Sequence, residues 1–189
     1  MDALHLRPAR PDDLPAILAI YNDVVCHSTA IYALEPATLA QRRAWYDERI
    51  AAGYPVLVAE QHGQVVGYAS YAEFRGATNA YRHSVEHSVH VRDDARGQGI
   101  GSALVRALFP LALAQGKHAM LGAIDAANTG SLRMHARLGF EPVGLLRQVG
   151  HKFGRWLDLA FVQRFLDAPD SPRPAVGLPA SSERRDAGA

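Results

Sequence analysis

Three glycines stand close together at Gly97, Gly99 and Gly101, directly after an apolar stretch that ends at Val91. Glycine tolerates positive φ angles and lets a ligand approach the backbone closely. The residues that follow, 99–115, predict a helix, and the first turn of a helix offers unpaired N–H groups and the positive end of its dipole. Strand, turn and helix together predict a site for an anion, most naturally a phosphate or pyrophosphate group.

Two common nucleotide-binding signatures do not fit this turn. A phosphate-binding loop of the Walker A type needs Gly-Lys-Ser/Thr, whereas Gly101-Ser102 contains no lysine. The dinucleotide fingerprint needs a third glycine, which is Leu104 when counted from Gly99 and Ser102 when counted from Gly97. A glycine-rich turn without any ligand stays open as the plainer alternative at this point.

Three histidines nearby, His83, His87 and His90, raise the question of a metal site. In a strand, His83 and His87 share a face but lie about 13 Å apart at ~3.3 Å per residue, and His90 faces the other way. Two ligands of one zinc ion cannot span that distance. We therefore expect no metal site here.

The glycine turn fits one further signature, R/Q-x-x-G-x-G/A, as Arg-Gly-Gln-Gly-Ile-Gly over residues 96–101, directly after the Val-His-Val strand of residues 89–91. This combination resembles the acetyl-CoA motif of the GNAT superfamily of N-acetyltransferases. Residues 128–140, Asn-Thr-Gly-Ser-Leu-Arg-Met-His-Ala-Arg-Leu-Gly-Phe, resemble the superfamily's helix beside the pantetheine arm and the turn after it. Two motifs in this order and at this separation are much more specific than either alone.

Residues 80–91 and 150–158 narrow the resemblance. Both segments are similar to the phosphinothricin and methionine sulfoximine acetyltransferase branch, and the likeness spans roughly residues 4–165. It implies a mixed α/β fold, namely a twisted mixed β-sheet with helices on both faces. The sheet would be split like a V between its central strands, where acetyl-CoA inserts. Homodimers are common in that branch, so the resemblance also implies a homodimer.

The resemblance implies acetyl-CoA as cosubstrate, no metal, and a set of residues that hold the cosubstrate. Backbone amides of Val89, His90 and Val91 would bind the pantetheine arm and polarise the thioester carbonyl. The turn would bind the pyrophosphate through Arg96, Gly97, Gln98, Gly99, Ile100, Gly101 and Ser102. Asn128 would contact the pantetheine arm, and it can cap the following helix at the same time.

Glu86 interrupts an apolar strand, where a carboxylate costs free energy unless it is paired or functional. Acetyl transfer to nitrogen needs a base, because the substrate amine is a cation at neutral pH and only its neutral form attacks a thioester. The superfamily places its catalytic carboxylate here, and a surface-facing glutamate is the alternative. His135 stands where many members have a tyrosine that protonates the leaving thiolate, so it is the candidate acid or else a packing residue.

Arg82 directly precedes this strand, and a guanidinium can grip a substrate carboxylate with two parallel hydrogen bonds. Residues at this position bind substrate in the branch that the chain resembles, which adds Tyr81 and His83 as candidates. An ordinary charged loop end is the alternative. For Cys26, which has no evident partner base, we expect a buried structural role rather than that of a nucleophile.

These observations predict an acetyl-CoA-dependent N-acetyltransferase that acetylates the amino group of a small amino-acid-like substrate by direct transfer in a ternary complex. The same chemistry on a polyamine, an aminoglycoside or a protein N-terminus is one alternative. A polyamine enzyme should show an acidic acceptor groove, whereas Tyr, Arg and His precede Glu86. A non-catalytic acyl-CoA sensor is the other alternative, against which the presence of Glu86 argues mildly.

The whole chain has 189 residues, 48% of them apolar, which suits one domain over residues 1–166. The proline-rich residues 167–189 predict a disordered tail. With 20 basic and 19 acidic residues, the chain has no charge surplus for binding nucleic acid or a membrane surface. It shows neither a signal peptide nor a long apolar run, and its single cysteine suits a reducing compartment, so we expect a cytoplasmic protein.

The elements that must position these residues follow from apolar spacing, caps and turn residues. Helices are expected to begin at residues 11 and 38 and to span residues 99–115 and 129–138. Strands are expected over residues 4–7, 56–60, 64–71, 83–91, 117–124, 140–149 and 156–165. Because strands and helices do not alternate strictly, the order indicates a mixed sheet with helices on both faces.

Overall fold

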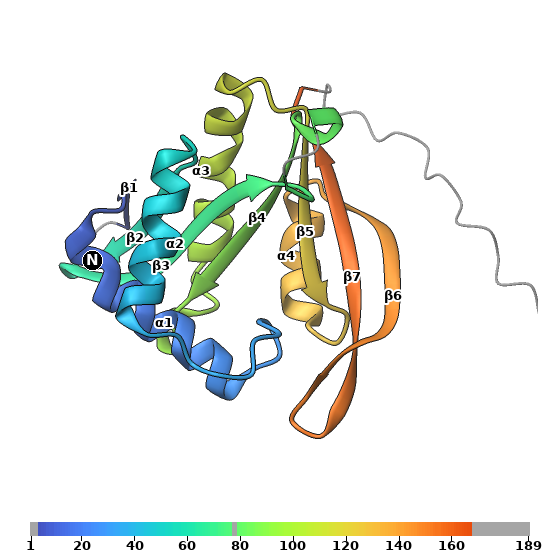
Figure 1. Ribbon diagram of the computed structural model, residues 1–189, viewed down its shortest axis with the longest axis horizontal. Coiled ribbons are helices and arrows are strands. Elements are labelled where there is room, and N and C mark those ends of the chain that lie inside the picture. Colours follow the sequence, from blue (N-terminus) through green and yellow to red (C-terminus); the bar gives the residue numbers. More distant parts are fainter. Residues whose placement is uncertain (1–3, 77–78, 168–189) are drawn as a thin grey trace, which may run out of the picture.

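The computed structural model describes residues 4–76 and 79–167 (Figure 1). The helices are α1 (Leu14–His27), α2 (Leu39–Ala51), α3 (Ile100–Ala114) and α4 (Thr129–Arg137). The strands are β1 (His5–Pro8), β2 (Val56–Gln61), β3 (Gln64–Glu73), β4 (Ser84–Val91), β5 (Ala119–Asp125), β6 (Glu141–Lys152) and β7 (Arg155–Phe165). Every predicted element is present, with ends that differ by a few residues.

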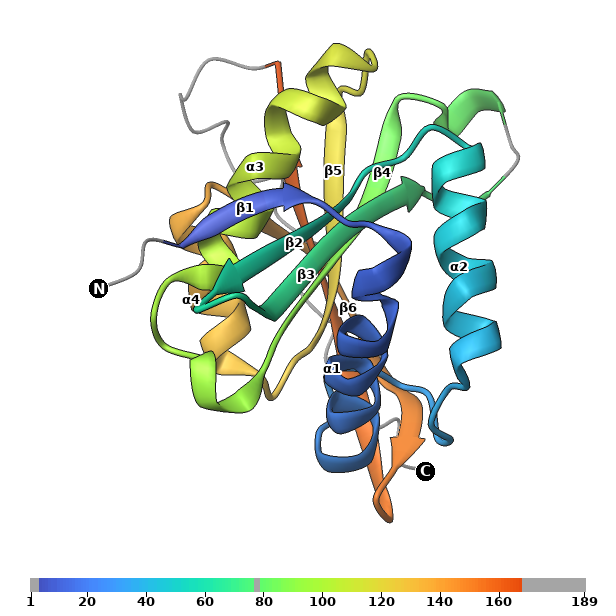
Figure 2. The same cartoon turned by 90° about the vertical axis from the view of Figure 1, so that its left-hand side faces the viewer.

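The described strands form one seven-stranded sheet in the order β1-β2-β3-β4-β5-β7-β6. Neighbouring strands run antiparallel except β4 and β5, which run parallel. Helices α1 and α2 cover one face, and α3 and α4 cover the other (Figures 1 and 2). The predicted fold class, a twisted mixed sheet with helices on both faces, is confirmed.

The sheet opens between its two parallel strands. β4 and β5 pair only where they begin, with Ser84 opposite Ala119, Val85 opposite Met120 and Glu86 opposite Leu121. Beyond these pairs β4 stays bonded to β3 and β5 stays bonded to β7, so the two strands separate (Figure 1). The split predicted between the central strands therefore begins directly after Glu86.

Strand β4 presents alternate side chains to the two helical layers, as the period of a strand requires. Val85, Val89 and Val91 belong to the apolar cluster that packs the sheet against α3. His90 faces the opposite layer, where its ring lies 5.3 Å from the ring of Tyr68. Because the side-chain period is two, Glu86 shares the α1/α2 face with His90.

Local sequence explains where the first two helices begin. The Thr38 hydroxyl accepts a hydrogen bond from the Gln41 amide at 3.2 Å, and the Gln41 side chain accepts one from the Thr38 amide at 2.8 Å, so the predicted capping box is present. The helix expected from residue 11 begins instead at Leu14, after a 3₁₀ turn over Pro11–Asp13. The Asp13 carboxylate binds the Arg10 amide at 2.7 Å, which fixes that tight turn.

A buried lysine fastens the segment between α1 and α2 to the β6–β7 hairpin. Lys152 is 3% exposed, and its ammonium donates to the carbonyl oxygens of Ser28 at 2.9 Å and Ile31 at 2.7 Å. The ring of Tyr32 packs so closely on Gly150 that a Cβ there would lie 2.6 Å from it. These contacts hold in place the segment that covers one side of the split.

Replacing Lys152 with methionine is expected to lower the free energy of unfolding by about 1–3 kcal/mol, because it leaves the half-buried carbonyl groups of Ser28 and Ile31 without this donor. The matched control is Lys117→Met, which removes an exposed hydrogen bond to the Arg82 carbonyl and should change stability by less than ~0.5 kcal/mol. Urea unfolding of both variants measures the difference. Equal effects would show that the Lys152 contacts do not hold the segment.

The tail predicted over residues 167–189 lies outside the described residues except for Asp167, whose carboxylate lies 2.6 Å from His118. Among residues 4–76 and 79–167, no helix is long and apolar enough to cross a membrane.

Candidate active site

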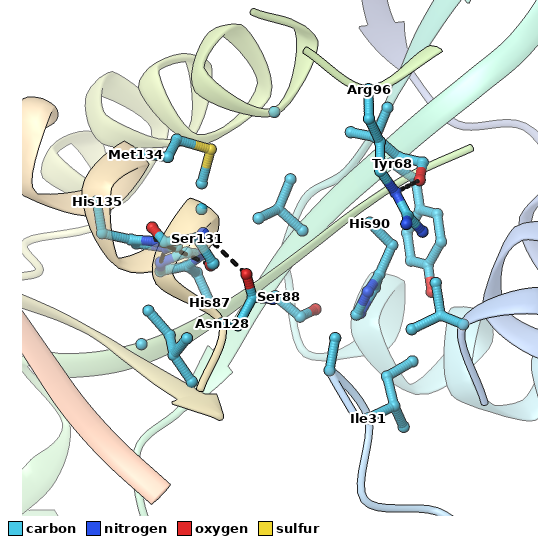
Figure 3. Close-up of a pocket in the computed structure, with 18 of the residues that line it drawn as sticks. Ile31, Tyr68, His87, Ser88, His90, Arg96, Asn128, Ser131, Met134 and His135 are labelled. Carbon is cyan, nitrogen blue, oxygen red and sulfur yellow. Dashed lines mark hydrogen bonds between the residues drawn. The ribbon is translucent and has the colours of Figure 1, made fainter. Parts of the chain in front are cut away.

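A cleft of about 900 Å³ occupies the split in the sheet and reaches both helical layers. One wall carries the glycine-rich turn, the start of α3 and the first residues of α4. The other carries the segment after α1 and the first turn of α2. Figure 3 shows Asn128, Ser131, Met134 and His135 on one side of Ser88 of β4, and Tyr68, His90 and Ile31 on the other. The cleft therefore has two sides, one in each helical layer, which meet along the edge of β4 that is not paired with β5.

The glycine-rich turn forms a cradle at the N-terminus of α3. Gly97 and Gly99 have φ angles of +78° and +80°, and a Cβ at either would meet no atom within 4 Å. These glycines are needed for the backbone conformation rather than for space. The Arg96 guanidinium helps to fix the turn, because it donates to the Val91 carbonyl at 3.1 Å and pairs with Asp93 at 2.6 Å. The N–H groups of the turn and helix start can then face an anion.

The residues predicted to hold acetyl-CoA gather around this cleft, with one exception. The lining includes Val89, His90, Val91, Arg96, Gly97, Gly99, Ile100, Gly101, Ser102 and Asn128. Gln98 is exposed and does not line it. The Asn128 carboxamide accepts from the Ser131 amide at 3.0 Å, which confirms the helix-cap interpretation. A cradle for a pyrophosphate and an unpaired strand edge for a pantetheine arm fit acetyl-CoA.

Glu86 lines the cleft at the point where the sheet opens. Its side chain is half-buried, and within the described chain its carboxylate has neither a hydrogen bond nor an ion pair. Burial raises the pKa of Glu86 above the ordinary range of a carboxyl group. A carboxylate made more basic in this way can accept a proton from an amine in the cleft.

His135 and His87 form a buried pair in the lining of the cleft. The Nδ1 atom of His135 lies 2.8 Å from the Ser131 carbonyl oxygen, which can only accept, so Nδ1 carries the proton. Its Nε2 then accepts from Nε2 of His87 at 3.2 Å, and Nδ1 of His87 is left buried without a partner. Burial lowers the pKa of both rings, that of His87 to about 3, so both are neutral near pH 7.

These bonds bear on the acid role predicted for His135. Both of its ring nitrogens are engaged within the protein, and its single proton points at the Ser131 carbonyl. The general-acid role stays a prediction, and this geometry argues for the packing alternative. From the sequence, His87 was a candidate only for metal binding. The alternation of side chains along a strand predicts that it faces α3 and α4, but nothing local predicts its pairing with His135.

The structure does not bring the predicted substrate residues to the cleft. Tyr81 and His83 are exposed, and neither they nor Arg82 contribute to its lining. The ring of Tyr81 packs against Phe74 with 5.8 Å between centroids, and Nδ1 of His83 donates to the Gly116 carbonyl at 2.8 Å. Their role in binding substrate stays a prediction, and their position outside the cleft lining argues against it.

Two other expectations concern Cys26 and metal binding. The buried position expected for Cys26 is wrong, because the residue is exposed in the last turn of α1. Val24 and Val25 take the buried positions of that turn, so the next residue faces outward. Within residues 4–76 and 79–167, no three metal-binding side chains converge. His87 and His90 point to opposite layers of the molecule.

A mixed sheet that opens between two parallel strands, with an anion cradle on one wall and a basic carboxylate at the apex, defines a transferase that uses an acyl-CoA. Comparison with known proteins makes this specific. Residues 17–140 match the profile of the acetyltransferase (GNAT) family. The chain belongs to this family, whose acetyl donor is acetyl-CoA, and it is an N-acetyltransferase.

Similar proteins cover most of the chain. An L-methionine sulfoximine/L-methionine sulfone acetyltransferase of Pseudomonas aeruginosa is 53% identical over 86% of this chain and 94% of its own length. A phosphinothricin N-acetyltransferase of Alcaligenes faecalis is 41% identical over 91% of this chain and 87% of its own. A phosphinothricin acetyltransferase from Sinorhizobium meliloti, crystallised with acetyl-CoA, has a TM-score of 0.84 at 38% identity, covering 95% of this chain and 97% of that one.

Proposed function

We propose that the enzyme transfers the acetyl group of acetyl-CoA to the amino group of a small amino-acid-like substrate of the methionine sulfoximine or phosphinothricin type. The observation that carries the proposal is the unpaired, half-buried carboxylate of Glu86 at the apex of the split, beside the glycine cradle. The names of relatives that are 53% and 41% identical support the substrate class.

Each wall of the cleft has its own part in the proposed mechanism. Acetyl-CoA, when bound, supplies a thioester carbonyl that an amine can attack. The N–H groups of Gly97–Ser102 hold the pyrophosphate, Asn128 meets the pantetheine arm, and the amides of Val89–Val91 polarise the carbonyl. Glu86 takes the proton of the substrate ammonium, directly or through a water, and the neutral amine attacks the thioester carbon. The C–S bond then breaks, so that an amide forms and coenzyme A leaves as a thiolate, which takes up the proton that the new amide nitrogen releases.

A thiol-release assay with acetyl-CoA across several amines tests the substrate class. The panel contains L-methionine sulfoximine, L-methionine sulfone, phosphinothricin, spermidine, an aminoglycoside and a peptide with a free N-terminus. The proposal expects turnover with the amino-acid analogues and little with the other amines. Faster turnover of spermidine or the peptide would assign the same chemistry to another acceptor, and no turnover with any amine would favour a sensor.

Direct transfer without an acyl-enzyme is part of the proposal. Cys26 is exposed and does not line the cleft, so it is not placed to act as a nucleophile there. Cys26→Ala should therefore keep near-normal turnover. Steady-state kinetics of the variant measure this, and mass spectrometry of the wild type after mixing with acetyl-CoA is the companion experiment. An acetyl-Cys26 adduct that forms and decays at the turnover rate would contradict direct transfer.

We also propose a cytoplasmic homodimer. Exposed apolar side chains gather on the β6–β7 hairpin, namely Leu145, Leu146, Val149, Phe153 and Trp156. An apolar surface of this kind supports an interface with a second copy. The single cysteine supports a reducing compartment.

A further inference from the structure

A buried cation without a counter-charge lines the α1/α2 side of the cleft. Arg42, in the first turn of α2, is 7% exposed and is one of the lining residues. Its guanidinium carbon lies 3.8 Å from the ring centroid of Tyr21 and 4.7 Å from that of Trp45. Its Nε atom is buried without a hydrogen-bond partner, and no acidic residue of the described chain pairs with it.

Another arginine whose side chain is largely buried, Arg7, has acidic partners, unlike Arg42. Arg7 pairs with Asp13 at 2.7 Å and with Glu60 at 2.8 Å. Burying an unpaired charge costs free energy, and contacts with aromatic faces offset only a part of that cost. A guanidinium kept in a cleft at this cost is explained if a ligand supplies the missing anion.

Other charged side chains that line the cleft are paired or lie on its other wall, so they do not compete with Arg42 for a ligand anion or neutralise its charge. Arg96 already pairs with Asp93, and Arg137 is exposed at the end of α4, on the wall of the glycine cradle. The Asp125 carboxylate, which could compete for the guanidinium, accepts instead from the Thr29 hydroxyl and the Ala127 amide. Arg42 is therefore the lining cation on the acceptor side that has no anionic partner within the described chain.

Arg42 also lies where an amino acid would need a cation. Its guanidinium carbon lies 4.7 Å from the Trp45 ring centroid, and the rings of Trp45 and His90 both pack against Tyr68, with centroids 6.0 and 5.3 Å away, so Arg42 and His90 line the same part of the cleft. His90 shares the α1/α2 face of β4 with Glu86, and Figure 3 shows it next to Tyr68 in the cleft. In an α-amino acid the carboxylate and the amine sit on one carbon. A site that brings the amine to the split therefore brings the carboxylate close by, where a cation on the same face can bind it.

We propose that Arg42 binds the α-carboxylate of the acceptor, with Tyr21 and Trp45 holding its guanidinium in position. The inference rests on the proposed function and makes it more specific, because it assigns to α2 the role predicted from sequence for Arg82. A guanidinium supplies two parallel N–H donors to a carboxylate, which a lysine cannot do.

The test compares two substrates that differ only in the carboxylate, L-methionine sulfone and 3-(methylsulfonyl)propylamine. Arg42→Gln should lower kcat/KM for the amino acid by roughly 10- to 100-fold and change that for the amine by less than about twofold. Arg42→Lys should lose less than Arg42→Gln, and with the same selectivity. Arg43→Gln is the matched control, because Arg43 is exposed on the same helix and should affect neither substrate.

A thermal-shift measurement separates binding from folding. L-methionine sulfone should raise the Tm of the wild type but not that of Arg42→Gln, whereas acetyl-CoA should raise both. If Arg42→Gln does not fold, Arg42→Lys carries the comparison. Equal losses on both substrates, or weaker acetyl-CoA binding, would overturn the assignment. Selective loss in Arg82→Gln with none in Arg42→Gln would also overturn it. Failure of the proposed function looks different, since the wild type would then acetylate no amino acid.

Discussion

Replacing Glu86 with glutamine is expected to lower kcat by about 10²- to 10⁴-fold, the usual effect of removing a general base. Glutamine keeps the size of the side chain but cannot take the proton of the substrate ammonium. Acetyl-CoA affinity should change little, because the cradle at Gly97–Ser102 is formed by backbone of the turn and α3 rather than by Glu86. Steady-state kinetics and acetyl-CoA titration measure the two quantities separately.

The pH dependence gives this prediction a second readout. Burial raises the pKa of Glu86, and the basic form predominates only above that pKa, so wild-type kcat/KM should rise with pH through it. Glu86→Gln should lose the inflection at that pKa, and its kcat/KM should instead follow the neutral fraction of the amine, which keeps rising with pH. Its defect should also shrink at higher pH, because more of the amine is then already neutral.

Glu141→Gln is the matched control, since Glu141 is an exposed glutamate on β6 and its loss should change neither kcat nor the pH profile. A large loss of stability in Glu86→Gln, with kcat unchanged in the folded fraction, would show that Glu86 has a structural role and is not the base.

Replacing Gly99 with aspartate is expected to weaken acetyl-CoA binding by about 100-fold or more, because it adds a negative charge where the pyrophosphate is proposed to bind. The residue also has a φ of +80°, which strains any side chain. Gly63→Asp controls for that strain, because Gly63 has a φ of +71° in the turn between β2 and β3, outside the cleft lining.

Isothermal titration of acetyl-CoA into both variants separates charge at the site from backbone strain. Gly63→Asp should bind acetyl-CoA as the wild type does, even if it melts at a lower temperature. Unchanged affinity in Gly99→Asp would place the acetyl-CoA site elsewhere in the molecule.

Local signals in the sequence were sufficient for most of the framework. The capping box from Thr38 to Gln41 and the glycine turn at 97–101 depend on neighbouring residues, and both are present as predicted. The fold class and the split followed from family resemblance, because periodicity alone does not say that β4 and β5 separate after Glu86.

What the sequence did not reveal depends on tertiary packing. Arg42 and Arg43 are adjacent and alike in the sequence, yet α2 buries one against Tyr21 and exposes the other. The pairing of His87 with His135 joins residues 48 positions apart. Cys26 lies at the end of an apolar stripe of α1, where a shift of one residue along the helix turns a side chain from the core to the solvent.

The most direct test of the central claim is the structure of the reaction product. Wild-type enzyme is incubated with L-methionine sulfone and acetyl-CoA labelled in the acetyl carbonyl, and the products are examined by mass spectrometry and NMR. The account predicts that the label forms an amide at the α-nitrogen, with equimolar release of coenzyme A thiol. Thiol release without an N-acetylated amino acid, or label that appears only on the enzyme, would contradict it.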